Sequence, residues 1–315
     1  MNSNNNSGNK KKKEIPVLSF LGRLFKTKPI SGIGLVILVV FVFVAIFADV
    51  LAPSKMTNGI LMGSLRARMV PPSAEHLLGT DNLGRDLMSY MIYGARTSVI
   101  LAVSCTIIST AVSVVIGVSS ATIGGWYDLI VQRLVDAWTS IPSLLISLIL
   151  MAMLGKGIPQ LIFVLSVPTG IGGSRLIRSA TYQVKDMDYV NMASMMGANK
   201  LWNMLKHILP NTMPMILMSL SAGVGGTIMA AASLSFLGFG VSVNTPDWGA
   251  LLTEAGRSNM YTAPWLALFP GIAVSLVVFA SAMFSDGVRD LLDPRLRGGA
   301  SSYKTKKKKK SKTHA

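Results

Sequence analysis

The stretch DMDYVNMASMMGANKLWNMLKHILP, residues 186–210, lies between two long apolar segments and decides how the rest of the chain is interpreted. It is too polar to cross a membrane, yet apolar residues recur at helical spacing on both sides of Gly197. Glycine tolerates a sharp turn, and proline ends a helix. The pattern therefore predicts a helical hairpin that breaks at Gly197 and stops at Pro210. An interfacial helix on lipid and a docking element for a soluble partner both fit it.

The composition indicates a multispanning membrane protein. Of 315 residues, 50% are hydrophobic and only 14% are charged, with a mean hydropathy of +0.51. The net charge of +16 does not indicate nucleic-acid binding, because the lysines gather in the two tails. The single cysteine, Cys105, lies in an apolar run, so an intramolecular disulfide is excluded.

Apolar runs long enough to cross a bilayer predict an all-α integral membrane protein with six transmembrane helices. We expect the spans at residues 31–51, 97–123, 129–154, 158–177, 212–237 and 264–284, within one membrane domain over 31–297. A cleaved signal peptide is the alternative for the first run, which is too long and begins too late for one. Residues 1–30 read as a disordered basic arm with an amphipathic lead-in, and 298–315 as a disordered lysine-rich tail.

Lysine and arginine placement predicts the orientation of the chain. Basic residues outnumber acidic ones on the side that holds both termini, and are nearly balanced by acidic residues on the other side. Both termini are therefore expected in the cytoplasm of a multi-pass plasma-membrane protein. The stretch 186–210 falls on the same side, where ATP is.

Residues in this stretch resemble the cytoplasmic loop of bacterial ABC importer permeases. The family pattern is Glu-Ala-Ala, three residues, Gly, nine residues, then a hydrophobic position, any residue and Leu-Pro. Here it aligns with residues 191–193, with Gly197 and with HILPN at 207–211, which is typical of the peptide and nickel branch; Asn191 and Met192 depart from Glu and Ala. In the family this loop is the coupling helix that docks on the ATPase subunit. The resemblance assigns that docking to Tyr189, Ala193, Gly197, Leu201, Leu205, His207, Leu209 and Pro210.

A second motif lies at residues 76–86, HLLGTDNLGRD, in a stretch that reads as a structured external loop. It resembles the signature His-Pro-Leu-Gly-Thr-Asp-x-x-Gly-Arg-Asp of the C-type permease of peptide and nickel importers, with Leu77 where proline is common. The matching signature residues are Gly79, Thr80, Asp81, Gly84, Arg85 and Asp86. A metal site at His76, Asp81 and Asp86 is the alternative, but one His and two Asp in a loop are weak evidence.

Asp136 is the ionisable residue inside a predicted span that needs an explanation, because burying a charge in lipid costs about 2.5–3.5 kcal/mol. A local ion pair with Arg133, three residues earlier, is one interpretation. A residue facing the translocation path or gate is the other. With Ser140 and Pro142 it matches the family's Asp-x-x-x-Ser-x-Pro pattern. Pro142 is expected to kink the span, although prolines are also common in membrane helices for packing.

The sequence has no Gly-x-x-x-x-Gly-Lys-Ser/Thr phosphate loop and no catalytic set. The resemblance implies a non-catalytic permease subunit of an ATP-driven importer for oligopeptides, dipeptides or a related solute such as nickel. It implies a second permease subunit, two cytoplasmic ATPases that hold ATP and Mg, and an extracellular solute-binding protein, with no cofactor on this chain. An ion-coupled secondary transporter and a membrane scaffold are the alternatives from other classes. Nucleic acid is not an expected partner, whereas membrane lipid is.

Overall fold

The computed structural model describes residues 24–25, 27–57, 60–242, 244–254 and 259–292. The lysine-rich tail and most of the N-terminal arm that the sequence predicts lie outside these residues. Within the described residues, five helices are long and apolar enough to cross a membrane. They are α2 (Pro29–Ile46), α4 (Leu87–Ile123), α7 (Ile158–Lys185), α10 (Leu209–Phe236) and α12 (Trp265–Leu292).

A sixth span is present if two shorter helices are counted as one. These are α5 (Gly125–Thr139) and α6 (Ser143–Leu154), whose axes differ by 82°. The all-helical membrane architecture expected from the composition is therefore confirmed, with five to six spans. The remaining helices are short: α3 (Ala48–Leu51), α8 (Asp188–Met195), α9 (Lys200–Asn203) and α11 (Trp248–Glu254), with a 3-10 turn at Leu65–Ala67 and a π-helical turn, η2, at Met204–Ile208. A two-stranded antiparallel sheet is formed by β1 (Met56–Thr57) and β2 (Ile60–Leu61).

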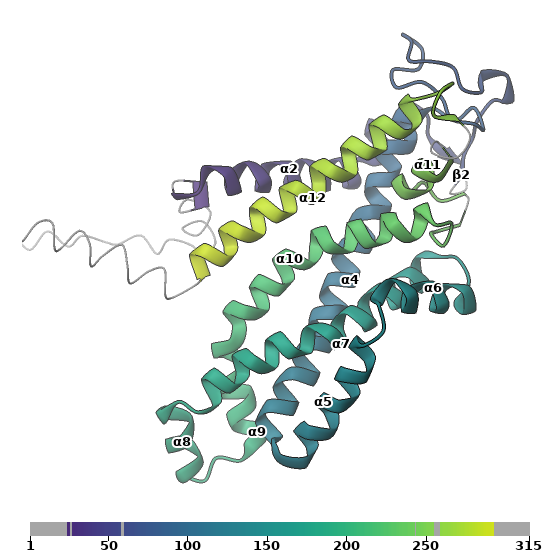
Figure 1. Ribbon diagram of the computed structural model, residues 1–315. Coiled ribbons are helices and arrows are strands. Elements are labelled where there is room, and N and C mark those ends of the chain that lie inside the picture. Colours follow the sequence, from purple (N-terminus) through teal and green to yellow (C-terminus); the bar gives the residue numbers. More distant parts are fainter. Residues whose placement is uncertain (1–23, 26, 58–59, 243, 255–258, 293–315) are drawn as a thin grey trace, which may run out of the picture.

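The long helices form two closely packed pairs joined by α10 (Figure 1). One pair is α2 with α12, and the other is α4 with α7, while α10 packs against both α4 and α12. Small residues allow the close approach of α4 and α7. A Cβ on Gly170 would lie 2.7 Å from the Ser109 carbonyl oxygen, and one on Gly117 would lie 2.6 Å from that of Ser174.

The third span differs from the continuous helix expected over 129–154. Pro142 has an extended backbone and stands directly before α6, so it does not kink a helix but separates two. Proline disfavours helical geometry in the residue before it and has no N–H to donate. The hydroxyls of Thr139 and Ser140 accordingly donate to the carbonyls of Val135 and Asp136, which compensates the end of α5.

The second span begins ten residues earlier than the apolar run, because Asp86 caps α4 at its N-terminus. The side chain of Asp86 accepts a hydrogen bond from the backbone N–H of Ser89 at 2.8 Å. The two motifs identified in the sequence lie at opposite ends of the molecule. Figure 1 shows α8 and α9 at one end of the helix bundle and the loop before α4 at the other.

Candidate functional site

The stretch between α7 and α10 folds into two short helices, which we call the α8–α9 hairpin. It consists of α8 (Asp188–Met195), a turn at Gly197, and α9 (Lys200–Asn203). Gly197 has φ +93°, a left-handed conformation that ends α8, and its N–H donates to the Ser194 carbonyl at 3.1 Å. A Cβ on Gly197 would meet no atom within 4 Å. The glycine is thus required by the backbone conformation and not by lack of space.

Polar side chains fix the two short helices to one another. Asn199 caps α9 by accepting a hydrogen bond from the Trp202 N–H at 2.7 Å. The buried amide of Asn203 donates to the Ser194 hydroxyl at 2.7 Å, and that hydroxyl donates to the Val190 carbonyl. The hairpin therefore has an internal framework that does not depend on a partner.

One side of the hairpin is anchored in the bundle and the other is exposed and apolar. Val190 and Ile208 are buried in a cluster that also holds Val118, Ile177, Val184 and Ile216 from α4, α7 and α10. The side chains of Met195 and Met196 are 87% and 88% exposed. We call the exposed set the apolar tip: Met192, Met195, Met196, Leu201, Trp202 and Leu205. An exposed apolar patch on a fixed support is typical of an interaction surface.

The residues assigned to docking from the sequence fall in three environments. Leu201 and Leu205 belong to the apolar tip, and Tyr189 is exposed beside it. Ala193 is half-buried and its carbonyl accepts from the Ala198 N–H at 3.0 Å across the turn. The His207 ring lies edge-on to two aromatic rings, with centroid distances of 6.0 Å to Tyr189 and 4.9 Å to Trp202.

The expectation that Pro210 ends a helix is wrong. The chain passes from α9 through a π-helical turn, η2 (Met204–Ile208), directly into α10, where Pro210 is in the first turn. Proline is tolerated there because early helical N–H groups lack an intrahelical partner. The turn shifts the hydrogen-bond register, since the Leu209 N–H donates to the Met204 carbonyl. Leu209 is partly buried against the same cluster as Ile208. The hairpin and the long helix α10 are thus continuous.

Two lysines tie the hairpin region to the end of α4. The Nζ of Lys185 donates to the Ala121 carbonyl at 2.8 Å, and that of Lys200 donates to the Ile123 carbonyl at 3.2 Å. Both acceptors lie in the last turn of α4, where carbonyl groups lack helical partners and the helix dipole favours positive charge. Movement of the hairpin is therefore linked to α4 as well as to α7 and α10.

A buried ionic cluster joins α4, α5 and α7 close to these lysines, and we call it the Asp128 cluster. Asp128 accepts hydrogen bonds from the Arg178 guanidinium, from the Tyr182 hydroxyl at 2.8 Å and from the Ser120 hydroxyl. Gln132 donates to the same Ser120 hydroxyl at 3.1 Å. Arg178 also lies over the Tyr182 ring, 4.8 Å from its centroid.

Sequence reasoning missed this cluster for a simple reason. The third apolar run begins at residue 129 and the fourth ends at residue 177, so Asp128 and Arg178 each lie one residue outside the expected spans. Each is an ionisable residue within a helix of the bundle, which is the signal that could have found the pair.

Asp136 has a closer partner than the one considered from the sequence. Its Oδ1 lies 2.6 Å from Nη2 of Arg175 on α7, whereas its Oδ2 lies 3.8 Å from Nη1 of Arg133. Nη2 of Arg175 also donates to the Thr139 hydroxyl at 2.6 Å. Asp128 with Arg178 and Asp136 with Arg175 therefore form two successive ionic links between α5 and α7.

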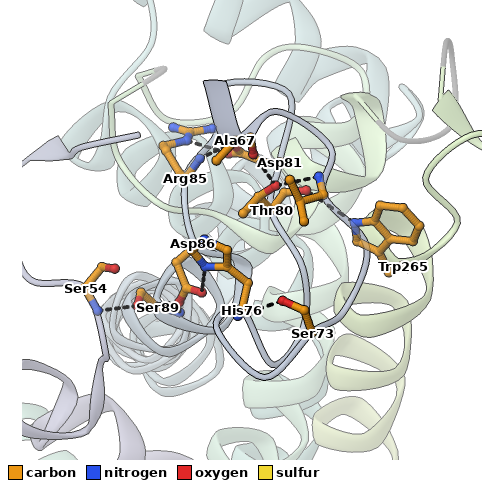
Figure 2. A network of polar contacts seen from close by, with 11 residues as sticks. Ser54, Ala67, Ser73, His76, Thr80, Asp81, Arg85, Asp86, Ser89 and Trp265 are labelled. Atoms are coloured by element: carbon orange, nitrogen blue, oxygen red, sulfur yellow. Dashed lines mark hydrogen bonds and ion pairs between the residues drawn. The ribbon is translucent and has the colours of Figure 1, made fainter. Parts of the chain in front are cut away.

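The signature loop, residues 76–86, is a self-supporting fold (Figure 2). The fully buried Asp81 carboxylate accepts from the Leu83 N–H at 2.9 Å, the Arg85 N–H at 2.8 Å and the Arg85 Nε at 2.5 Å. The Thr80 hydroxyl donates to the Ala67 carbonyl at 2.5 Å. The Asp81 contacts close the loop on itself, and the Thr80 contact fixes it to the preceding stretch.

Two glycines of the signature loop occupy positions that other residues fit poorly. Gly79 and Gly84 have φ +83° and +73°. A Cβ on Gly84 would overlap the Ser64 carbonyl, and one on Gly79 would lie 2.7 Å from the Val70 carbonyl oxygen. The glycines are therefore needed for the close passage of neighbouring backbone.

The three residues considered for a metal site, His76, Asp81 and Asp86, instead stabilise the signature loop through hydrogen bonds within the protein. Asp86 caps α4 and accepts a hydrogen bond from the Ser89 hydroxyl at 2.7 Å, while Nδ1 of His76 lies 3.1 Å from its other oxygen. Asp81 is occupied by Arg85 (Figure 2). Across the described part of the chain, no group of three His, Cys, Asp or Glu side chains is arranged to hold a metal ion.

Comparisons with known proteins agree with this arrangement. Residues 113–298 match the family described as "Binding-protein-dependent transport system inner membrane component", and residues 21–72 match "N-terminal TM domain of oligopeptide transport permease C". The chain is similar to the glutathione transport system permease protein GsiD of Escherichia coli O6:K15:H31, Shigella sonnei and Shigella flexneri serotype 5b. Each is 34% identical over 276 residues, which cover 88% of this chain and 90% of the relative.

Permease subunits of this kind are non-catalytic, multi-pass components of the inner membrane that work with partner ATPases and a binding protein. The family match spans more than half of the chain, and the relatives span most of it. The chain belongs to the ABC importer permeases of the dipeptide and oligopeptide family.

Proposed function

We propose that this permease imports peptide-type solutes, forms half of the translocation path, and receives the motion of an ATPase through the α8–α9 hairpin. The observation that carries the proposal is the apolar tip, which is exposed on a hairpin whose other side is anchored by Val190 and Ile208. The named relatives support a peptide-type solute, since glutathione is a small peptide.

The proposed lever acts through contacts already described. Closure of the ATPases on ATP would displace the apolar tip of residues 186–210. The displacement would reach α10 through the continuous backbone of η2, and α4 through Lys185 and Lys200. ATP and Mg belong to the partner ATPases in this proposal, and the chain binds no cofactor of its own.

The proposed assembly is a heterodimer with a second permease subunit, two cytoplasmic ATPases and an extracellular solute-binding protein. Both termini are placed in the cytoplasm, so the hairpin faces the ATPases and the signature loop faces the binding protein. The two motifs lie at opposite ends of the bundle, as contact with partners on opposite sides of the membrane requires (Figure 1). The basic residues on the hairpin side support the placement of that side in the cytoplasm.

The test replaces apolar contacts at the tip. Leu201→Asp with Leu205→Asp should prevent co-purification of the ATPases from mild detergent, because two charges would be buried without partners in an apolar interface. Leu65→Asp is the matched control, since Leu65 is 72% exposed in the loop region before α4. Retention of the ATPases by the double variant would contradict the docking site. Recovery of the wild-type chain alone would instead favour a secondary transporter or a scaffold.

A further inference from the structure

Three charged side chains lie together on an uncovered face of α5 and α7. Arg133, Asp136 and Arg175 are 77%, 49% and 48% exposed, and Asp136 lies 2.6 Å from Arg175 and 3.8 Å from Arg133. The contact to Arg133 is longer than a hydrogen bond. The Arg133 guanidinium is therefore near the carboxylate but largely open to its surroundings.

All three residues belong to helices that could cross a membrane, Arg133 and Asp136 to the bent pair of α5 and α6, and Arg175 to α7. Asp136 is three residues before the end of α5, close to the bend that leads to α6, and Arg175 is ten residues before the end of α7. The charges therefore lie within these candidate spans and not in the loops that connect them.

A face with this charge does not contact lipid tails. An ionised side chain within a membrane span is costly, and such residues face a bundle interior or a water-filled cavity. We infer that this face of α5 and α7 borders the aqueous translocation path. We also infer that Arg133, Asp136 and Arg175 form a binding site that attracts the carboxylate of a passing solute.

The charge balance determines the class of ligand. One carboxylate opposes two guanidinium groups, which leaves the three side chains with one net positive charge. Arg175 already donates to Asp136 and to the Thr139 hydroxyl, so Arg133 is the group best placed to receive a carboxylate. Guanidinium groups bind carboxylates through paired, charge-assisted hydrogen bonds. Asp128 and Arg178, the nearest other ion pair between these helices, neutralise one another.

This inference rests on the proposed function and is tested independently of ATPase docking. Ala137 is exposed, follows Asp136 and lies one helical turn from Arg133. In the full assembly in native membrane vesicles, with Cys105→Ala removing the native cysteine, Ala137→Cys is treated with anionic and cationic methanethiosulfonates of similar size. Val39→Cys on apolar α2 is the matched control.

The expected result is that Cys at 137 reacts with both reagents, and that the anionic one reacts roughly threefold to tenfold faster at low salt. Adding Arg133→Gln should remove most of that preference, whereas Arg133→Lys should keep it. Alanyl-alanine with a free carboxylate should slow modification, and its carboxamide should not. The control at 39 should react with neither reagent.

Two results would overturn the inference. Failure of both reagents to modify position 137, in a variant present at wild-type level, would show that this face is not aqueous. Equal rates for the two reagents would show that this binding site does not select carboxylates. Loss of the ATPases on purification would count against the proposed function instead, because the labelling does not depend on them.

Discussion

Arg178 on α7 donates two hydrogen bonds to Asp128 on α5, from Nε to Oδ1 at 2.7 Å and from Nη2 to Oδ2 at 2.5 Å. The paired geometry is the strong form of an arginine–carboxylate contact. Asp128 is buried, and α7 leads within ten residues into the α8–α9 hairpin. This contact therefore connects α5 to the helix that carries the hairpin.

Removing one partner of that pair should destabilise the protein strongly. Asp128→Ala leaves the partly buried Arg178 charge without its carboxylate, and we expect a loss on the order of 2 kcal/mol, seen as lower thermal stability in detergent. Asp136→Ala removes a half-exposed pair and should cost less than about 1 kcal/mol.

A double variant distinguishes two causes of this instability, the loss of the hydrogen bonds and the unpaired charge that remains. Asp128→Leu combined with Arg178→Met should recover most of the stability, because apolar replacement of both partners avoids an unpaired, partly buried charge. If the double variant is as unstable as Asp128→Ala, the loss does not arise from the stranded arginine.

Gly197→Val should uncouple ATP hydrolysis from transport. A β-branched residue in a left-handed conformation is strained, and relief of that strain would reshape the turn between α8 and α9. Gly197→Asn is the control, since asparagine tolerates this conformation. The measurement compares ATPase activity and uptake in proteoliposomes of the assembly. Normal uptake by the valine variant would refute the role of the turn.

Gly84→Ala should loosen the signature loop. The added methyl group would overlap the Ser64 carbonyl, and φ is +73°. Limited proteolysis of the intact membrane protein should cut this region several times faster in the variant than in the wild type. Gly226→Ala is the matched control, because a Cβ there meets no atom within 4 Å. Equal cutting of wild type and Gly84→Ala would show that the backbone shifts freely.

Asp247, in the loop before α11, should make stability depend on pH. Burial raises the pKa of its carboxyl above 3.8, although the Ala250 N–H donates to it at 3.2 Å. The folded state then holds this proton more tightly than the unfolded state, so the contribution of Asp247 to stability is greatest at low pH and falls as pH rises through the folded pKa. Thermal scans from pH 4 upward should show this slope reduced in Asp247→Asn. An unchanged slope would assign it to other groups.

The hairpin was predictable because its apolar periodicity and its glycine are local signals. The structure confirms two short helices with the turn at Gly197. The outcome at Pro210 was not predictable, because proline is compatible with both a helix end and a first turn. The π-helical register of Met204–Ile208, which carries the chain into α10, has no clear signature in the sequence.

Most of the features that could not be predicted from the sequence are contacts between different helices. Apolar periodicity predicts that a helix exists but not which residue of another helix it meets. Arg133, three residues before Asp136, was therefore the visible partner, while the closer Arg175 was 39 positions away. Asp128 was not predicted as a site residue because it lies one residue before the expected span 129–154. In the structure it joins three helices, since it accepts hydrogen bonds from Ser120 on α4 and from Arg178 on α7.

Cross-linking from the apolar tip tests the central claim most directly. With Cys105→Ala removing the native cysteine, Met195→Cys places a thiol on a side chain that is 87% exposed. A short thiol-to-amine cross-linker in native membranes should join this variant to an ATPase subunit, identified by mass, whereas Leu65→Cys should give no such product. An ATPase product from position 65 and none from position 195 would contradict the assignment of the hairpin as the coupling element.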